Sequence, residues 1–113
     1  MNIDKYMLLT IKNNMLLKDS IIDIATLMGH TPTHPISSHI FCLEFNLTQE
    51  DHDKILLRLN LLSDKRSLNL AKIRSELTTL VPEISELSTP IFKGMIEIFI
   101  KQFDIPLKIS DQN

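Results

Sequence analysis

Residues 3–28 limit most strongly what this chain can fold into, because they have the pattern of one long amphipathic helix. Leu8, Met15 and Ile22 recur at seven-residue spacing, and Ile11 lies between the first two. Toward the C-terminal half, the apolar residues spread over more than one face. A helix of this kind either lies at the centre of a bundle or is shared between subunits.

Two polar residues, Asn14 and Lys18, fall near this apolar stripe. Polar residues at such positions can select the register or the oligomeric state of paired helices. The alternative is that both simply lie at the edge of the stripe. We expect the rest of the chain to cover part of the helix, chiefly through a phenylalanine-rich last helix, and we expect the remaining apolar surface to bind another subunit or protein.

The end of this helix and the next element carry clear local signals. Gly29 suits the left-handed backbone at a helix C-terminus. Pro32 and Pro35 disfavour helical geometry in the residues before them, so the connection is expected to be extended. Apolar residues then predict a short helix over residues 36–45.

Two further helices are predicted in the middle of the chain. Asn46 suits a left-handed helix stop, and Thr48 suits the N-cap of a helix that runs to Leu62. After an exposed turn, three- and four-residue apolar spacings predict a helix over residues 68–80, which Pro82 stops.

The last helix is predicted over residues 91–104, with Thr89 as its N-cap and Pro90 at its first position. It is apolar over most of its circumference, so we expect it to be the most buried helix. Residues 105–113 form a short tail, and residues 110–113 are expected to be mobile.

Together these elements predict an all-α fold, a five-helix bundle-like single domain over residues 1–113, with a long helix in 1–29 and a helical core in 36–104. Two glycines are too few for the tight turns of a many-stranded fold. A net charge of −2 creates no general attraction to nucleic acid or membranes, and no apolar run is long enough to span a bilayer. A single cysteine favours a reducing compartment, which we expect to be the cytoplasm.

Four histidines invite a metal hypothesis, since three of them fall within ten residues: His30, His34, His39 and His52. The prolines interrupt any shared helix face there, so exposed loop histidines are expected instead. Cys42 lies in an apolar run and is expected to be a buried thiol. Neither a glycine-rich phosphate loop nor a Gly-x-Ser-x-Gly turn occurs. We therefore expect no catalytic residues, no metal, no cofactor and no enzymatic activity.

A local group of basic residues lies between positions 54 and 74, and Asp64 is its one acidic neighbour in sequence. The group consists of Lys54, Arg58, Lys65, Arg66, Lys72 and Arg74. It has three interpretations: a solvated face, a surface for an acidic partner, or a DNA-binding helix-turn-helix.

Residues 35–104 resemble a small all-helical Bacillus family typified by YhaI. The resemblance rests on a proline before a short aromatic-containing helix, on Leu-Thr-Gln-Glu at 47–50 and on Gly-Met-Ile-Glu-Ile-Phe-Ile at 94–100. That family tends to have glycine where this chain has Asn46. The resemblance to it implies no functional residues for this chain. In size and character the chain is also similar to small proteins of SPbeta-like Bacillus prophages. That resemblance implies a non-enzymatic role in lysis–lysogeny control, through contact with a peptide-sensing transcriptional regulator.

The expected function is therefore protein–protein interaction by a homo-oligomer. A small DNA-binding regulator and a purely structural oligomer remain as alternatives. The predicted interaction residues are Leu8, Ile11, Met15 and Ile22 in the first helix and Lys65, Arg66, Lys72 and Arg74 in the basic group.

Overall fold

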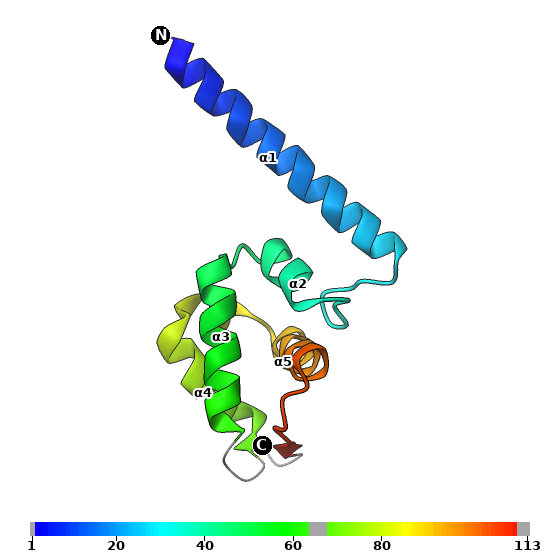
Figure 1. The fold of residues 1–113 in the computed structure, drawn as a ribbon, viewed down its shortest axis with the longest axis vertical. Coiled ribbons are helices and arrows are strands. Elements are labelled where there is room, and N and C mark those ends of the chain that lie inside the picture. The colour runs from blue at the N-terminus through cyan, green and yellow to red at the C-terminus, as the bar shows by residue number, and fades with distance from the viewer. Residues whose placement is uncertain (1, 64–67, 111–113) are drawn as a thin grey trace.

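The computed structural model describes residues 2–63 and 68–110, and across these ranges the chain folds into five α-helices (Figure 1). The all-α prediction is confirmed. The helices are α1 (Asn2–Leu27), α2 (Ser38–Glu44), α3 (Gln49–Leu62), α4 (Leu70–Leu80) and α5 (Thr89–Phe103). A short 3₁₀ helix, η1 (Pro82–Glu86), links α4 to α5, and two-residue strands β1 (Leu68–Asn69) and β2 (Ile109–Ser110) pair in parallel.

The helix ends follow the expected local chemistry at several positions. Gly29 has φ 103° and follows α1, and the N–H of His30 donates to the carbonyl of Ala25, which closes the helix end. Asn46 is left-handed, with φ 59°. The Thr48 side chain accepts from the backbone N–H of Asp51, whose carboxylate accepts in return from the N–H of Thr48. The predicted start of α3 is confirmed.

The predicted N-cap of the last helix is off by one residue. Ser88 has extended backbone geometry and its hydroxyl accepts from the N–H of Ile91, so Ser88 is the N-cap and Thr89 is already helical. Serine and threonine are both good N-caps, and proline is tolerated throughout the first turn. The Ser-Thr-Pro sequence therefore permits either start.

The hydrophobic core lies among α2, α3, α4, η1 and α5. Its largest side chains include Phe41, Phe92 and Phe99, all fully buried. Helix α5 contributes the most to this core, as its apolar circumference predicts, with Phe92, Gly94, Met95, Ile96 and Phe99 buried. At Gly94 the connection between α1 and α2 comes so close that a Cβ atom would overlap the carbonyl of Thr33. Glycine is needed there for space.

The C-terminal segment is more ordered than predicted. Asp104 ends α5 with φ 50°, and the side chains of Ile105 and Leu107 are buried against the core. Ser110, expected to be mobile, instead lies in β2 opposite Asn69. The two buried apolar side chains hold the segment along the body, which places β2 beside β1. Residues 111–113 lie outside the described residues.

Helix α1 extends beyond the body that the other elements form (Figure 1). The radius of gyration is 16.2 Å, whereas a compact domain of this length would have about 13 Å. The longest dimension is 57 Å and the shortest is 23 Å. The prediction that the last helix is the chief cover for α1 is wrong: α1 rests mainly on α2.

Candidate interaction surface

The apolar side chains of α1 are largely in contact with solvent. Within residues 4–27, Ala25 alone is buried. Large side chains in α1 and immediately after it are more than half exposed: Tyr6, Met7, Leu8, Leu9, Ile11, Met15, Leu16, Leu17, Ile24, Leu27 and Met28. Soluble monomers rarely expose large apolar patches, which makes α1 the candidate interaction surface of this chain.

The C-terminal turns attach α1 to the body. Ile21 and Ile22 are half-buried and Ala25 is buried, on the side that packs against α2. The ammonium group of Lys18 donates to the side-chain oxygen of Asn46 at 2.5 Å. Lys18 therefore lies where the helix meets the body, and the N-terminal half of α1 extends past that junction.

His30 fixes the connection between α1 and α2, and the expectation that it is exposed is wrong. Its side chain is fully buried, Nε2 lies 2.8 Å from a carboxylate oxygen of Glu44, and Nδ1 accepts from the N–H of Ile36 at 3.2 Å. Because a carboxylate accepts and an amide N–H donates, the ring proton sits on Nε2. The imidazole thus links both ends of the loop to α2.

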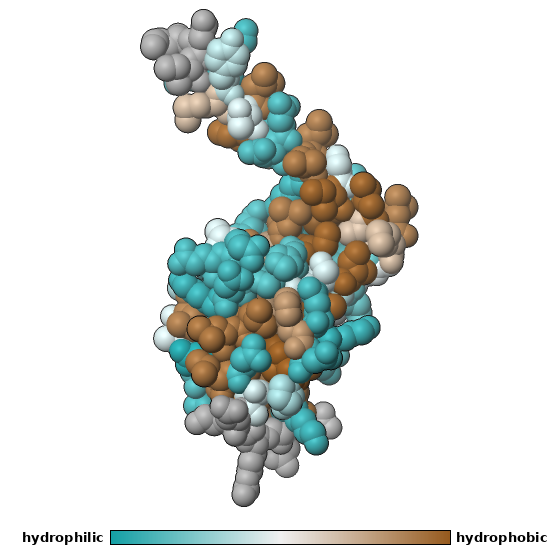
Figure 2. All heavy atoms as spheres, in the orientation of Figure 1, coloured by the Kyte–Doolittle hydropathy of each residue, from teal (hydrophilic) through white to brown (hydrophobic). Residues whose placement is uncertain are grey.

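Two apolar stripes run along α1 on different sides, since successive residues are rotated by about 100° around a helix. The inner stripe contains Leu8, Ile11, Met15, Ile22 and Ala25, and its lower end packs on α2. The outer stripe consists of Tyr6, Leu9, Leu16, Leu17, Ile24 and Leu27, every one of them more than half exposed. In Figure 2 hydrophobic side chains gather over the lower half of α1.

The four interaction residues predicted in this helix share the inner stripe. Leu8, Ile11 and Met15 are exposed, at 53%, 53% and 59%, while Ile22 is half-buried against the body. The predicted residues did not include the outer stripe. Its signal was present in the three-residue spacing that relates Tyr6 to Leu9 and Ile24 to Leu27 and in the seven-residue spacing that relates Leu9 to Leu16 and Leu17 to Ile24.

The described residues of the basic group lie in different environments in the fold. Lys65 and Arg66 lie outside the described residues, and Lys72 is exposed. Arg74 is half-buried: its guanidinium donates to the carbonyls of Ile84, Ser85 and Leu87 and lies 5.2 Å from the centre of the Phe92 ring. Arg58 pairs with Glu76 and Lys54 with Glu50, both at 3.3 Å.

His52 is the second histidine whose expected exposure is wrong. It is buried between α2 and α5, with its ring stacked on that of His39 and 4.9 Å from that of Phe99, centre to centre. Nε2 lies 2.8 Å from the Ser38 hydroxyl, and Nδ1 lies 3.2 Å from a carboxylate oxygen of Asp53. Nδ1 therefore carries the ring proton, and the hydroxyl donates to Nε2. The other two histidines, His34 and His39, are exposed.

Three groups in this region have shifted pKa values: burial is the main cause for His52 and Cys42, and hydrogen bonds are the main cause for Asp53. Desolvation lowers the pKa of His52, against the opposing effect of its hydrogen bond to Asp53. The same hydrogen bond, followed by one from Gln49, lowers the pKa of the Asp53 carboxyl. Burial raises the pKa of the Cys42 thiol to about 12, which makes it a poor nucleophile at neutral pH. The expectation of a buried thiol is confirmed.

The free energy of unfolding is expected to fall as pH drops below about 6.5. In that range the unfolded chain protonates the imidazole of His52, while the folded state, whose pKa is lower, resists protonation. Urea unfolding from pH 7.5 to 5.5 measures this, with His52→Gln as the variant that removes the titrating ring. If His52→Gln shows the same pH dependence as the wild type, His52 is not the source of the effect.

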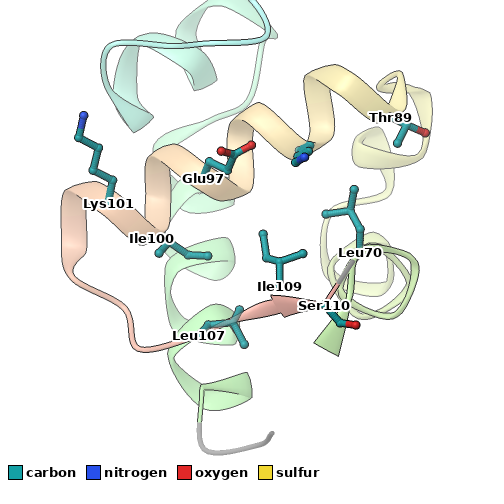
Figure 3. A pocket seen from close by; sticks show the side chains of 9 residues that line it. Leu70, Thr89, Glu97, Ile100, Lys101, Leu107, Ile109 and Ser110 are labelled. Atoms are coloured by element: carbon teal, nitrogen blue, oxygen red, sulfur yellow. The ribbon is translucent and has the colours of Figure 1, made fainter. Parts of the chain in front are cut away.

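Two grooves flank α5 on the body. One, of about 680 Å³, lies between α5 and β2, and Figure 3 shows Leu70 and Ile109 pointing toward the helix. The other, of about 710 Å³, lies between α5 and residues 33–37. Neither groove is lined by the predicted interaction residues.

Among the described residues, no three His, Cys, Asp or Glu side chains converge so that they could hold a metal ion. Within the same residues, every helix is too short or too polar to cross a lipid bilayer. Comparisons with protein-family models, with curated proteins and with solved structures find no match to this chain.

Proposed function

We propose that this protein is a non-enzymatic protein–protein interaction module that binds through α1 and associates with itself. The observation that carries the proposal is the exposure of two apolar stripes on a helix that is attached to its body near one end. A helix of 26 residues is about 39 Å long. The N-terminal half of α1, which extends past the body, can therefore bind in a groove of a partner protein without disturbing the core of the body.

The inner stripe has the spacing of a helix that binds in a groove. Leu8, Ile11 and Met15 occupy positions i, i+3 and i+7, the pattern by which amphipathic helices insert into hydrophobic grooves of other proteins. All three side chains are more than half exposed. Burying such side chains would contribute about 1.5–3 kcal/mol each before the costs of association are subtracted.

The partner class we propose is a peptide-sensing transcriptional regulator of the lysis–lysogeny type. This part of the proposal rests on the resemblance to small prophage proteins. The surface of α1 is compatible with such a partner, because it offers apolar contacts in place of a catalytic or metal site. Direct DNA binding has less support, since the guanidinium groups of Arg74 and Arg58 are engaged within the body.

Met15→Glu is expected to abolish partner binding while the helical content and stability stay close to the wild type. The side chain is exposed, so the charge disturbs a binding surface without entering the core. Cross-linking in a bacterial cell that carries the native gene, followed by mass spectrometry, identifies the partners. The matched control is Leu57→Glu, which is 63% exposed and lies on another helix, α3.

Ile22→Glu should behave differently, because Ile22 is half-buried where α1 meets α2. A charge there is expected to lower the free energy of unfolding by about 1–3 kcal/mol. Circular dichroism during urea unfolding separates this loss of stability from a loss of binding. If Met15→Glu captures the same proteins as Leu57→Glu, the inner stripe is not a binding surface.

A further inference from the structure

The outer stripe has the same spacing when it is read in either direction along α1. From Tyr6 the steps to Leu9, Leu16, Leu17, Ile24 and Leu27 are three, seven, one, seven and three residues. The polar residues inside the stripe, Asn13 and Ser20, lie equally far from its centre. A stripe with this symmetry is complementary to a reversed copy of itself.

We propose that α1 pairs with α1 of a second copy of this chain in antiparallel orientation, through the outer stripe. The two-fold axis passes between Leu16 and Leu17, so that each of them meets its own counterpart in the second copy, displaced by about 1.5 Å along the helix axis. Leu9 then lies opposite Ile24 of the second copy, and Tyr6 lies opposite Leu27. Such an interface is isologous and closes as a dimer. This inference rests on the proposed function, in which α1 is the binding element.

The charges beside the outer stripe favour the antiparallel orientation. A strip of four charged residues follows one flank of the stripe: Lys5 and Lys12 in the N-terminal half, Asp19 and Asp23 in the C-terminal half. In a two-fold antiparallel pair, the same flank of both copies lies on one side of the interface. Lys12 therefore lies between Asp19 and Asp23 of the second copy, displaced from each by about 3 Å along the axis. The contact occurs twice.

A parallel pair would not bring these charges together. It would place the charged flank opposite the other flank of the stripe, which carries Thr10, Asn14 and Ile21. Charged residues beside an apolar seam set the orientation of paired helices. The distribution of lysine and aspartate along α1 thus selects one orientation.

The position of the body leaves room for this pairing. The residues of α1 that pack on the body are centred on Ile22 and Ala25 of the inner side, with Ile21 at the flank between the two stripes, so a second helix can approach the outer stripe without displacing α2. The outer stripe spans 22 residues, about 33 Å. Stable interfaces bury roughly 800 Å² per partner, and all six side chains of the outer stripe are more than half exposed and so available for burial.

Disulfide cross-linking of full-length chains tests the register. Leu9→Cys and Ile24→Cys chains, mixed and oxidised, are expected to form a mixed disulfide-linked dimer. Leu9→Cys alone is expected to give little cross-linked dimer, because the two Leu9 positions would be about 22 Å apart, far beyond disulfide reach. Native Cys42 is buried and does not compete. Efficient cross-linking of Leu9→Cys to itself would show a parallel pair and overturn the proposal.

Light scattering with size exclusion over a micromolar to submillimolar series tests the pairing itself. Leu16→Glu is expected to weaken the dimer by at least about 30-fold, because it places a charge at the centre of the interface in both copies. Leu57→Glu, an equally exposed leucine on α3, should leave it unchanged. Lys12→Glu should weaken it about two- to fivefold, and Lys12→Glu with Asp19→Lys and Asp23→Lys should restore it.

A wild-type chain that stays monomeric over the whole series would overturn the pairing. That result would also remove self-association from the proposed function, but it would leave partner binding through the inner stripe standing as long as partner capture depends on Met15. Conversely, a dimer that forms while Met15→Glu captures the same proteins as the wild type would refute partner binding through the inner stripe and not the pairing.

Discussion

Replacing Phe99 by alanine is expected to lower the free energy of unfolding by about 3–5 kcal/mol. The side chain is fully buried on α5, and its ring centre lies 4.9 Å from that of His52 and 6.1 Å from that of Phe103. Alanine would leave a cavity that the helices around it cannot close, because α2, α3 and α5 all contribute to the core. Small domains have about 5–15 kcal/mol in total, so the variant is expected to be close to unfolding.

Urea unfolding followed by circular dichroism at pH 7.5 measures the effect, and Phe103→Ala is the matched control. Phe103 lies one helical turn away on α5, but it is 36% exposed, so its removal opens less of a cavity and is expected to cost clearly less. Equal losses for the two variants would mean that the core is centred elsewhere than on Phe99.

Elements governed by local chemistry could be predicted from the sequence. The boundaries at Gly29 and Asn46 and the N-cap at Thr48 depend on backbone geometry and on hydrogen bonds that span three or four residues, which the order of residues alone specifies. The apolar periodicity likewise identified every α-helix in the described residues, because an amphipathic helix must bury one face.

Features that depend on contacts distant in sequence could not be predicted. The periodicity of α1 shows that the helix has apolar stripes that other side chains should bury. It does not specify which element buries them, and in the structure α1 packs mainly on α2. The burial of His30 depends on Glu44 and Ile36, which the α1–α2 loop brings around it. Gly94 is needed because the carbonyl of Thr33 touches α5 at that position. These arrangements arise when helices pack, and local sequence does not encode them.

In the candidate site, too, the features set by one helix could be predicted from the sequence, and the features set by packing between elements could not. Leu8, Ile11 and Met15 were predicted because they share a face of one helix, and they are exposed together. The basic residues were grouped by their proximity in sequence. The fold then turns Arg74 inward and leaves Lys72 exposed. Lys72 and Arg74 are two positions apart and so are rotated by about 200° around the helix axis, which places them on nearly opposite sides; charge clustering in sequence does not by itself make a surface patch.

Arg74→Ala is therefore expected to lower the free energy of unfolding by about 2–3 kcal/mol, as a structural residue would. Its guanidinium donates to the carbonyls of Ile84, Ser85 and Leu87 and packs over Phe92, which holds η1 and the start of α5 against α4. Without the guanidinium, these carbonyls lose a charged donor in a region partly shielded from water. Urea unfolding at neutral pH measures the loss.

Lys72→Ala supplies the matched comparison, because Lys72 is a basic residue of the same helix with an exposed side chain. Its stability is expected to stay within about 0.5 kcal/mol of the wild type. Arg74→Lys should recover only part of the loss, since one nitrogen, Nη2, makes all three carbonyl contacts and an ammonium group could replace it, whereas the planar guanidinium over the Phe92 ring would be lost. If instead Arg74→Ala is as stable as Lys72→Ala and both weaken binding to duplex DNA in a salt-dependent manner, the basic group acts as a nucleic-acid surface and Arg74 is not a structural residue.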